Sequence, residues 1–195
     1  MKANNFKIKQ CLPDCHILVN PAVKEGFQGR AKNGMFIAVP DYLKEKVTDV
    51  SPNHWRIQAC ILKVKTSRLL ILNTYFPVDP KTIRFDDTEL LEILDIIDKV
   101  LENNEFSDII WGGDVNCGFL RRTGFVESVD RFLSELQLKR SWEIFQADFT
   151  HTFSVDERTY TSTLDHFFWN EQLNDRVKDA GVLHLVENTS DHAVI

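Results

Sequence analysis

The stretch Ile-Ile-Trp-Gly-Gly-Asp-Val-Asn at residues 109–116 decides the fold of this chain. Its first three residues form an apolar run without a turn signal, which predicts a buried central strand. Gly112 and Gly113 would then let the chain bend sharply. In extended backbone, Asp114 and Asn116 would lie on one face just past the strand, where α/β proteins gather ligands. The alternative is a Gly-Asp turn in which Asn is a turn former.

The composition is that of an ordinary globular domain. The chain has 195 residues, of which 43% are hydrophobic and 27% charged, which predicts a single domain over residues 1–195. No apolar run could span a bilayer and no signal peptide opens the sequence, so we expect an intracellular protein, nuclear or cytoplasmic and not secreted, without a membrane partner. The net charge of −6 argues against a broadly basic nucleic-acid surface, but it allows a local basic patch or a metal-bridged phosphate.

The four cysteines show neither a disulfide pattern nor a zinc pattern. They stand at positions 11, 15, 60 and 117, without a CxxC pair. The sequence therefore predicts free thiols with no disulfide partner.

Strands and helices alternate through the middle of the chain. Apolar runs predict strands at 36–39, 57–64, 69–76, 149–155, 162–169 and 182–186. Helical spacing of apolar residues predicts helices at 86–101 and 124–136. The polar loop 156–161 would join two of the strands as a hairpin. This order predicts a mixed α/β fold with helices packed over sheets.

Polar groups follow apolar strands at four positions. They are Tyr75, Asp114 with Asn116, Asp165, and Asp191 with His192. Each alone has an ordinary explanation, such as a half-buried strand aromatic, a surface carboxylate or a satisfied loop histidine. Together they supply complementary chemistry, because a carboxylate can orient an imidazole, further carboxylates bind a hard divalent cation, and Asn and Tyr hold phosphate oxygens. The set predicts metal-assisted hydrolysis of a phosphate ester.

A basic pair lies in the polar, glycine-containing segment 24–34. Arg30 and Lys32 give this segment local positive charge, and Arg30 is a candidate substrate-binding residue for a phosphate. A solvated surface pair is the alternative.

Several motifs resemble, in order and spacing, those of the endonuclease/exonuclease/phosphatase superfamily. They are Asn-Thr-Tyr-Phe-Pro at 73–77, Gly-Asp-Val-Asn at 113–116, Ser-Thr-Leu-Asp-His at 162–166 and Ser-Asp-His at 190–192. The Asn-Gly and apolar run at 33–39 is similar to the strand that precedes the tyrosine motif. The likeness runs from Gly34 to the C-terminus. It is strongest to the apurinic-type endonuclease domains of non-LTR (LINE-like) retrotransposons, which residues 150–153 also resemble.

The resemblance implies a four-layer α-β-β-α sandwich and a DNA endonuclease that depends on Mg²⁺ or Mn²⁺. His192 would be the general base or the phosphate-polarising group, oriented by Asp165. Asp114 would activate the nucleophile or serve the leaving group. Asn116 and Tyr75 would contact the phosphate. DNA is accordingly the expected partner.

The family's principal Mg²⁺ ligand has no counterpart in the sequence. Members carry it as the Glu of a Gln-Glu motif, and no Gln-Glu precedes Gly34. Glu25 falls in a polar loop and not at the end of a strand. By the resemblance, Asp191 would lie at the edge of the metal site. Val78 stands where some members have Asn. We therefore expect a partial domain of marginal stability that shows little or no Mg²⁺-dependent nicking of DNA. Two alternatives stay open: an inactive remnant that acts as a binding module, and a phosphomonoesterase of the same fold for lipid or inositol phosphates.

Overall fold

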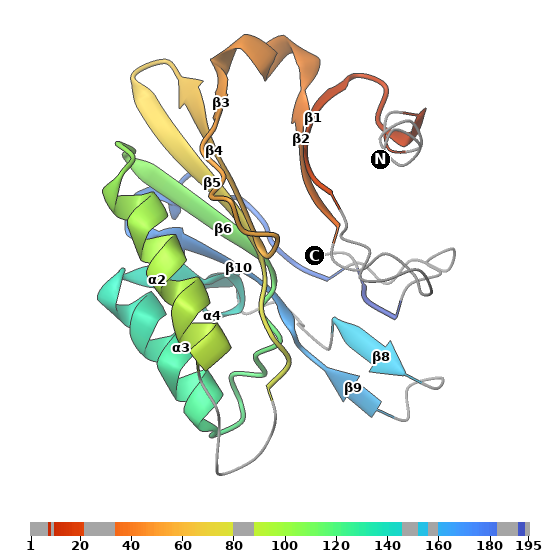
Figure 1. The fold of residues 1–195 in the computed structure, drawn as a ribbon, viewed down its shortest axis with the longest axis vertical. Coiled ribbons are helices and arrows are strands. Elements are labelled where there is room, and N and C mark those ends of the chain that lie inside the picture. The colour runs from red at the N-terminus through yellow and green to blue at the C-terminus, as the bar shows by residue number, and fades with distance from the viewer. Residues whose placement is uncertain are drawn as a thin grey trace.

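The centre of the molecule is a six-stranded sheet in the order β3-β4-β5-β6-β10-β7 (Figure 1). The computed structural model describes residues 8, 10–21, 34–79, 88–145, 152–155, 160–182 and 191–193. The strands of the sheet are β3 (Val47–Asp49), β4 (Ile57–Val64), β5 (Ser67–Tyr75), β6 (Asp108–Asp114), β7 (Leu138–Arg140) and β10 (Asp165–Asn170). Strands β5 and β6 are parallel, and all other neighbours in the sheet are antiparallel.

Different layers cover the two faces of this sheet. Helices α2 (Thr88–Glu102) and α3 (Gly124–Glu135) pack on one face, and the pair β1 (Cys15–Asn20) and β2 (Met35–Pro40) lies on the other (Figure 1). The helices bury Leu90, Ile93, Leu94, Ile97, Val100, Phe125, Val126, Val129 and Leu133. Strand β2 packs Ile37 and Val39 against Cys60. The mixed α/β class is confirmed, and the described residues show three layers of the sandwich.

Short elements complete the described structure. They are η1 (Asp41–Lys46), α4 (Ser141–Phe145), the two-stranded β8 (Phe153–Val155) and β9 (Tyr160–Ser162), and η2 (Glu171–Leu173). The helices of the described residues are all too short or too polar to cross a membrane.

The two glycines of the opening stretch lie inside β6, which continues to Asp114 instead of bending after Trp111. A Cβ at Gly112 would overlap the ring of Phe167, and one at Gly113 would overlap the backbone of Thr74. Gly113 also has a φ of +141°, which residues with a side chain rarely adopt. The glycines thus allow β5 and β10 to approach β6 closely just before Asp114.

The sequence prediction is wrong for the predicted strand 162–169, which is two strands. Strand β9 pairs with β8, and the chain then crosses into the central sheet as β10. The backbone N–H groups of Leu164 and Asp165, which the break would leave unpaired, donate to Thr152 Oγ1 at 2.8 and 3.0 Å. The Thr152 hydroxyl therefore stabilises the segment that crosses from β9 to β10. The apolar pattern of 162–169 does not reveal this break between the two strands.

The other elements agree with the sequence more closely. Strand β4 has the predicted bounds, and β2, β5, α2 and α3 shift by a few residues at their ends. The strand β1 has no counterpart in the prediction. Val182 is not in a strand. Residues 183–186, 86–87 and 149–151 lie outside the described residues.

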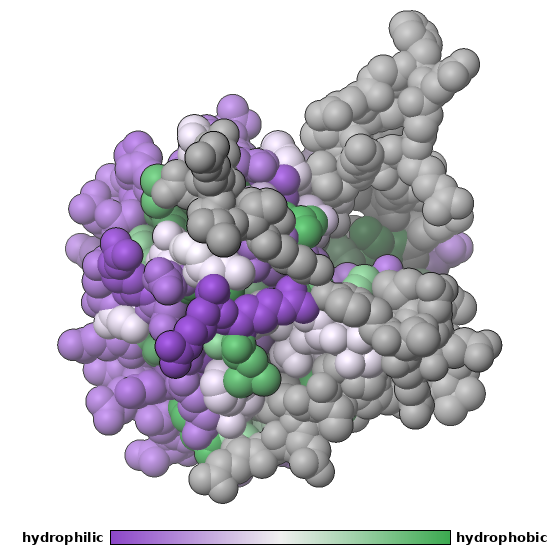
Figure 2. Space-filling view, turned by 90° about the horizontal axis from the view of Figure 1, so that it is seen from below, coloured by the Kyte–Doolittle hydropathy of each residue, from purple (hydrophilic) through white to green (hydrophobic). Residues whose placement is uncertain are grey.

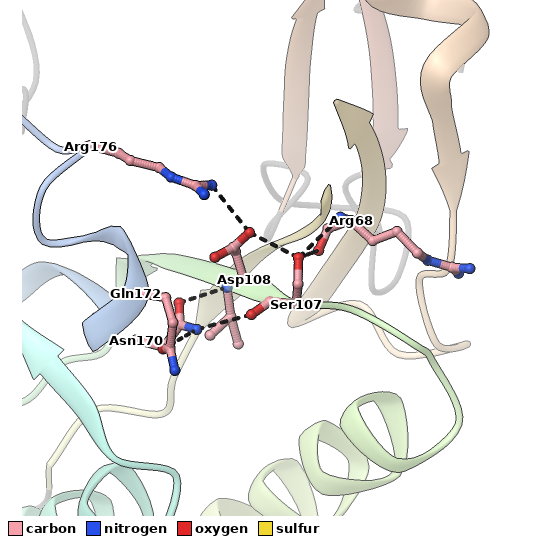
Figure 3. Close-up of polar contacts among 7 residues, drawn as sticks. Arg68, Ser107, Asp108, Asn170, Gln172 and Arg176 are labelled. Atoms are coloured by element: carbon pink, nitrogen blue, oxygen red, sulfur yellow. Dashed lines mark hydrogen bonds and ion pairs between the residues drawn. The ribbon is translucent and has the colours of Figure 1, made fainter. Parts of the chain in front are cut away.

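A polar network joins the strands at the edge of the sheet where β6 begins (Figure 3). Asn170, at the end of β10, accepts from Ile109 N at 3.1 Å and donates to Ser107 O at 3.2 Å. The buried carboxylate of Asp108 accepts from Ser107 Oγ at 2.9 Å and lies 3.4 Å from the Arg176 guanidinium. These bonds fix the register of β6 against β10, and hence the pairing of Asp114 with Asp165 at the other end of these strands.

Candidate active site

Three of the predicted site residues stand side by side where the central strands meet. Tyr75 ends β5, Asp114 ends β6 and Asp165 begins β10. In the sheet register Asp114 is paired with Tyr75 on one side and with Asp165 on the other. Because paired residues project to the same face, the three side chains share the face that carries β1 and β2.

His192 reaches the two carboxylates from a separate segment of the chain. Its Nδ1 lies 2.8 Å from Asp165 Oδ2, a hydrogen bond in which the imidazole donates. Its Nε2 lies 4.0 Å from Asp114 Oδ2. The predicted convergence of these three residues is therefore confirmed as geometry, while their catalytic roles stay predictions.

Thr152 holds in position both the segment that carries Asp165 and the segment that carries His192. It is fully buried, and its hydroxyl accepts the N–H groups of Leu164 and Asp165. Its carbonyl oxygen accepts from Ala193 N at 2.7 Å, directly after His192. One residue thus fixes the backbone on either side of the Asp165–His192 pair. In the sequence, only the family likeness of residues 150–153 pointed to this segment.

Substituting Thr152 by valine should destabilise the fold. Valine keeps the shape of threonine but leaves two buried N–H groups without an acceptor, a cost of about 1–3 kcal/mol in the free energy of unfolding. Thr152→Ser retains the acceptor and is the matched control. Urea unfolding measured on both variants would contradict this role if the two behaved alike.

Burial and mutual charge shift the titration of the site. Burial, followed by the charge of Asp165, raises the pKa of Asp114 to about 6. The hydrogen bond that His192 donates to Asp165 raises the pKa of His192 above its ordinary value, against the opposing effect of partial burial. The pKa of Asp114 therefore lies closer to neutral pH than that of an ordinary carboxyl, and a group is most effective as a general acid or base when its pKa is near the working pH.

Asn116 does not extend the strand as the sequence predicted. Its φ of +49° turns the chain, so Asp114 and Asn116 are not alternate residues of one extended segment. The Asn116 N–H donates to Asp114 Oδ1 at 3.0 Å, and its side-chain Nδ2 donates to Phe76 O at 2.9 Å. The Asn116 side-chain amide has a second N–H, which can donate a hydrogen bond to a phosphate oxygen.

Tyr75 lies against two residues that the sequence did not single out. The Arg56 guanidinium is 4.0 Å from the Trp55 ring centroid and 5.2 Å from that of Tyr75, and it donates to Tyr75 O at 3.1 Å. Glu89 of α2 fixes Arg56 through a 2.8 Å ion pair. Trp55 and Arg56 precede β4 in a polar turn, so no periodicity marks them.

The second histidine of the predicted motifs, His166, belongs to the core. It is buried, and its Nε2 contacts Cys117 O at 2.9 Å. Burial lowers its pKa to about 4, so the ring is neutral at physiological pH. Of the two motif histidines, only His192 can exchange protons with a substrate.

Solved structures share this arrangement of strands and helices. The chain matches the endonuclease domain of TRAS1, a telomere-specific non-LTR retrotransposon, with a TM-score of 0.63 at 19% identity, covering 91% of this chain and 77% of that one. It matches an endonuclease/exonuclease/phosphatase family protein from Leptotrichia buccalis with a TM-score of 0.69 at 18% identity, covering 98% and 76%. It also matches the 3′ phosphatase NExo from Neisseria, bound to product DNA hairpin, with a TM-score of 0.66 at 16% identity, covering 99% and 80%.

The chain has the endonuclease/exonuclease/phosphatase fold. No protein-family model matches the sequence, and no curated protein sequence matches it. At these identities the likeness establishes the fold alone.

Proteins of this fold imply a divalent metal, and the described residues offer part of a site for one. Donor atoms of Asp114, Asp165 and His192 lie within 4.8 Å of one another. Two carboxylates suit a hard cation such as Mg²⁺ or Mn²⁺, whose other positions water can fill. Because Asp165 is hydrogen-bonded to His192, Asp114 is the carboxylate best placed to bind an ion.

Two predicted site residues are not part of the Asp114–Asp165–His192 group in the described structure of this endonuclease/exonuclease/phosphatase fold. Asp191, the predicted metal ligand, is exposed and outside the donor group, although its charge raises the pKa values of both Asp114 and His192. Arg30, the predicted phosphate contact, lies outside the described residues, as does Glu25.

Proposed function

We propose that this chain is a metal-dependent phosphodiesterase that cuts DNA, of the kind found in non-LTR retrotransposons. The observation that carries the proposal is the Asp165–His192 hydrogen bond of 2.8 Å beside Asp114, at the end of the central strands. The motif order of the sequence supports it, and so do the neighbours of this fold, one named as an endonuclease and one as a phosphatase with DNA.

The geometry lets one oxygen atom contact both His192 and Asp114. Their facing atoms are 4.0 Å apart, so an oxygen at about 2.8 Å from each would form two hydrogen bonds. That oxygen can belong to an attacking water, which can donate to both atoms, or to the substrate phosphate when Asp114 and His192 both carry a proton to donate. With water, His192 Nε2 takes the proton as the water attacks phosphorus, and the bond between phosphorus and the leaving deoxyribose oxygen breaks. Asp165 stabilises the resulting imidazolium through Nδ1–H, and the leaving oxygen takes a proton from solvent water.

Asp114 is the residue that would hold the divalent ion, with water in the other positions of the ion, because Asp165 is hydrogen-bonded to His192. When bound, that ion supplies positive charge to polarise the phosphoryl oxygens. Asn116 would orient the phosphate through its amide, and Tyr75 would contact the same phosphate from β5.

Supercoiled plasmid provides the test. Incubation with Mn²⁺ or Mg²⁺ should convert it slowly to open circles, and EDTA should stop the conversion. The double variant Asp165→Asn/His192→Gln should be inactive, and equal nicking by that variant would overturn the proposal. Release of phosphate from a 3′-phosphorylated oligonucleotide without nicking would favour the phosphomonoesterase alternative. DNA binding without any cleavage would favour the inactive remnant.

The loop between Asn116 and α3 offers a contact for the DNA backbone. Arg121 and Arg122 lie there, next to Leu120, which is 95% exposed. Seen from below the view of Figure 1, the described part of the surface is mainly hydrophilic, with scattered hydrophobic residues (Figure 2). A local basic pair on an otherwise acidic protein suits one or two phosphate contacts.

Arg122→Ala should weaken DNA binding about equally for all sequences. If Arg122 neutralises one phosphate, the slope of log K against log salt should fall in magnitude by about 1. Arg131→Ala, which removes an exposed arginine from α3, is the control and should leave the slope unchanged. Fluorescence anisotropy over a salt series measures both, and an unchanged slope for Arg122→Ala would exclude the contact.

A further inference from the structure

The side chain of Tyr75 is held through its ring and not through its hydroxyl. Among the described residues, Tyr75 makes hydrogen bonds with its backbone N–H and C=O only. The residue is half-buried, and the sheet register places it beside Asp114. Its hydroxyl can therefore donate to a phosphate at the site, and the contacts of the ring decide where that hydroxyl lies.

The guanidinium of Arg56 is the charged group that contacts this ring. It lies over two aromatic rings, 5.2 Å from the Tyr75 centroid and 4.0 Å from the Trp55 centroid. The two rings are themselves 6.3 Å apart and tilted by 43°. A planar cation is attracted to the electron-rich faces of aromatic rings, and arginine suits such stacking better than lysine does. Arg56 thus joins the Tyr75 ring to the neighbouring indole.

Arg56 also fixes the backbone of Tyr75. The Tyr75 N–H donates to Arg56 O at 3.0 Å, and Arg56 Nη1 donates to Tyr75 O at 3.1 Å. The next N–H, that of Phe76, donates to Asp114 O at 2.8 Å. One arginine therefore holds both the ring and the peptide groups of Tyr75, at the point where β5 meets the end of β6.

Glu89, in the first turn of α2, fixes the orientation of the guanidinium. Its Oε1 accepts from Arg56 Nε at 3.0 Å and lies 2.8 Å from Arg56 Nη2. Each of the three guanidinium nitrogens thus has a partner, and the Arg56 side chain is only 11% exposed. A guanidinium held at all three nitrogens cannot turn toward a substrate, so any effect of Arg56 on catalysis passes through Tyr75.

We propose that Arg56 is a positioning residue that holds the Tyr75 hydroxyl where it donates to a non-bridging oxygen of the substrate phosphate. The inference rests on the proposed function for the presence of that phosphate. It deepens that function, because it assigns the placement of a phosphate contact to a residue that itself contacts neither the phosphate nor the carboxylates of the site.

A double-mutant cycle on plasmid nicking tests the inference. Arg56→Met replaces the guanidinium by an uncharged chain and should lower kcat/KM by about 5–30-fold, the effect of a largely desolvated cation–π contact. In Tyr75→Phe, which lacks only the hydroxyl, the same substitution should cost less than about twofold, because the group that it positions is absent. Equal losses in the two backgrounds would indicate a general disturbance of the site and would overturn the inference.

Arg56→Lys keeps the inference testable if the methionine variant does not fold. Lysine retains the charge but lacks the planar guanidinium and its fork of donors. It should also lose activity only where the Tyr75 hydroxyl is present, and full activity would overturn the inference. Arg68→Met is the matched control, because it removes an arginine that pairs with Glu105 at 3.3 Å near the other end of β5. That variant should leave the rate unchanged.

A measurement without DNA separates this inference from the proposed function. The chain has three tyrosines, so in protein labelled with ¹³C in the tyrosine rings the Tyr75 signal is the one absent from Tyr75→Phe. In Arg56→Met and Arg56→Lys this signal should move toward its position in urea-unfolded protein, while that of the exposed Tyr42 stays in place. An unchanged Tyr75 signal would overturn the inference even if the protein nicks DNA. A displaced signal in a protein that does not cut DNA would support the hold of Arg56 on Tyr75 and count against the proposed function alone.

Discussion

Replacing His192 by alanine is expected to slow metal-dependent nicking by about 10²–10⁴-fold, the usual contribution of a positioned acid–base group. The imidazole is the group that joins the two carboxylates, with contacts of 2.8 Å to Asp165 and 4.0 Å to Asp114. No other described residue brings a titrating nitrogen to these atoms. His16→Ala, on β1, removes a histidine far from the pair in the sequence and should leave the rate unchanged.

The effects of His192→Ala and Asp165→Asn on the rate of nicking should be non-additive. Asp165 acts through His192, because its carboxylate holds Nδ1–H and stabilises the charged ring. Once His192 is absent, removing that carboxylate should cost little more. Rates of the two single variants and the double variant decide this, and strictly multiplicative losses would show that Asp165 has an independent function.

The pH dependence distinguishes the two roles open to His192. Its pKa is raised by Asp165, so a general base would make the rate increase with pH through a value above 6.5. A charged, phosphate-polarising imidazole would make the rate decrease over the same interval. In either case Asp165→Asn removes the first cause of the shift, so the inflection should move to lower pH.

The positions of Tyr75 and Asp114 were predictable because each follows an apolar run. Strands β5 and β6 bury Leu70, Leu72, Ile109 and Trp111, and this pattern is visible in the sequence. A strand that ends at a polar residue delivers that residue to the sheet edge. Motif order then indicated that the carboxylates of Asp114 and Asp165 would meet.

The supporting contacts were not predictable, since they depend on single atoms from distant segments. Thr152 Oγ1 accepts two N–H groups twelve and thirteen residues away. Asn116 adopts a positive φ, and its amide bonds a carbonyl forty residues earlier. Neither hydrogen bond can be predicted from the periodicity or the composition of the sequence around it.

Asp114→Asn is expected to stabilise the metal-free protein while it removes activity. Burial and the charge of Asp165 raise the pKa of Asp114 to about 6, so the folded state binds its proton more tightly than the unfolded chain does. Stability from this group is therefore lost as pH rises from about 4 to about 6. Above that interval the wild-type protein carries a buried carboxylate that asparagine lacks.

The gain should be about 1–3 kcal/mol in the free energy of unfolding near pH 7.5 and should vanish near pH 4, because one unit of pKa corresponds to about 1.4 kcal/mol. Asparagine keeps an oxygen for the Asn116 N–H, so that bond is not lost. Urea unfolding in EDTA measures the difference, with Asp98→Asn on the exposed side of α2 as control. Added Mn²⁺ should then raise the melting temperature of the wild type more than that of the variant, since an ion bound to Asp114 stabilises only the folded protein. A variant that is less stable at both pH values would show that the Asp114 carboxylate is not the unfavourable charge that its burial implies.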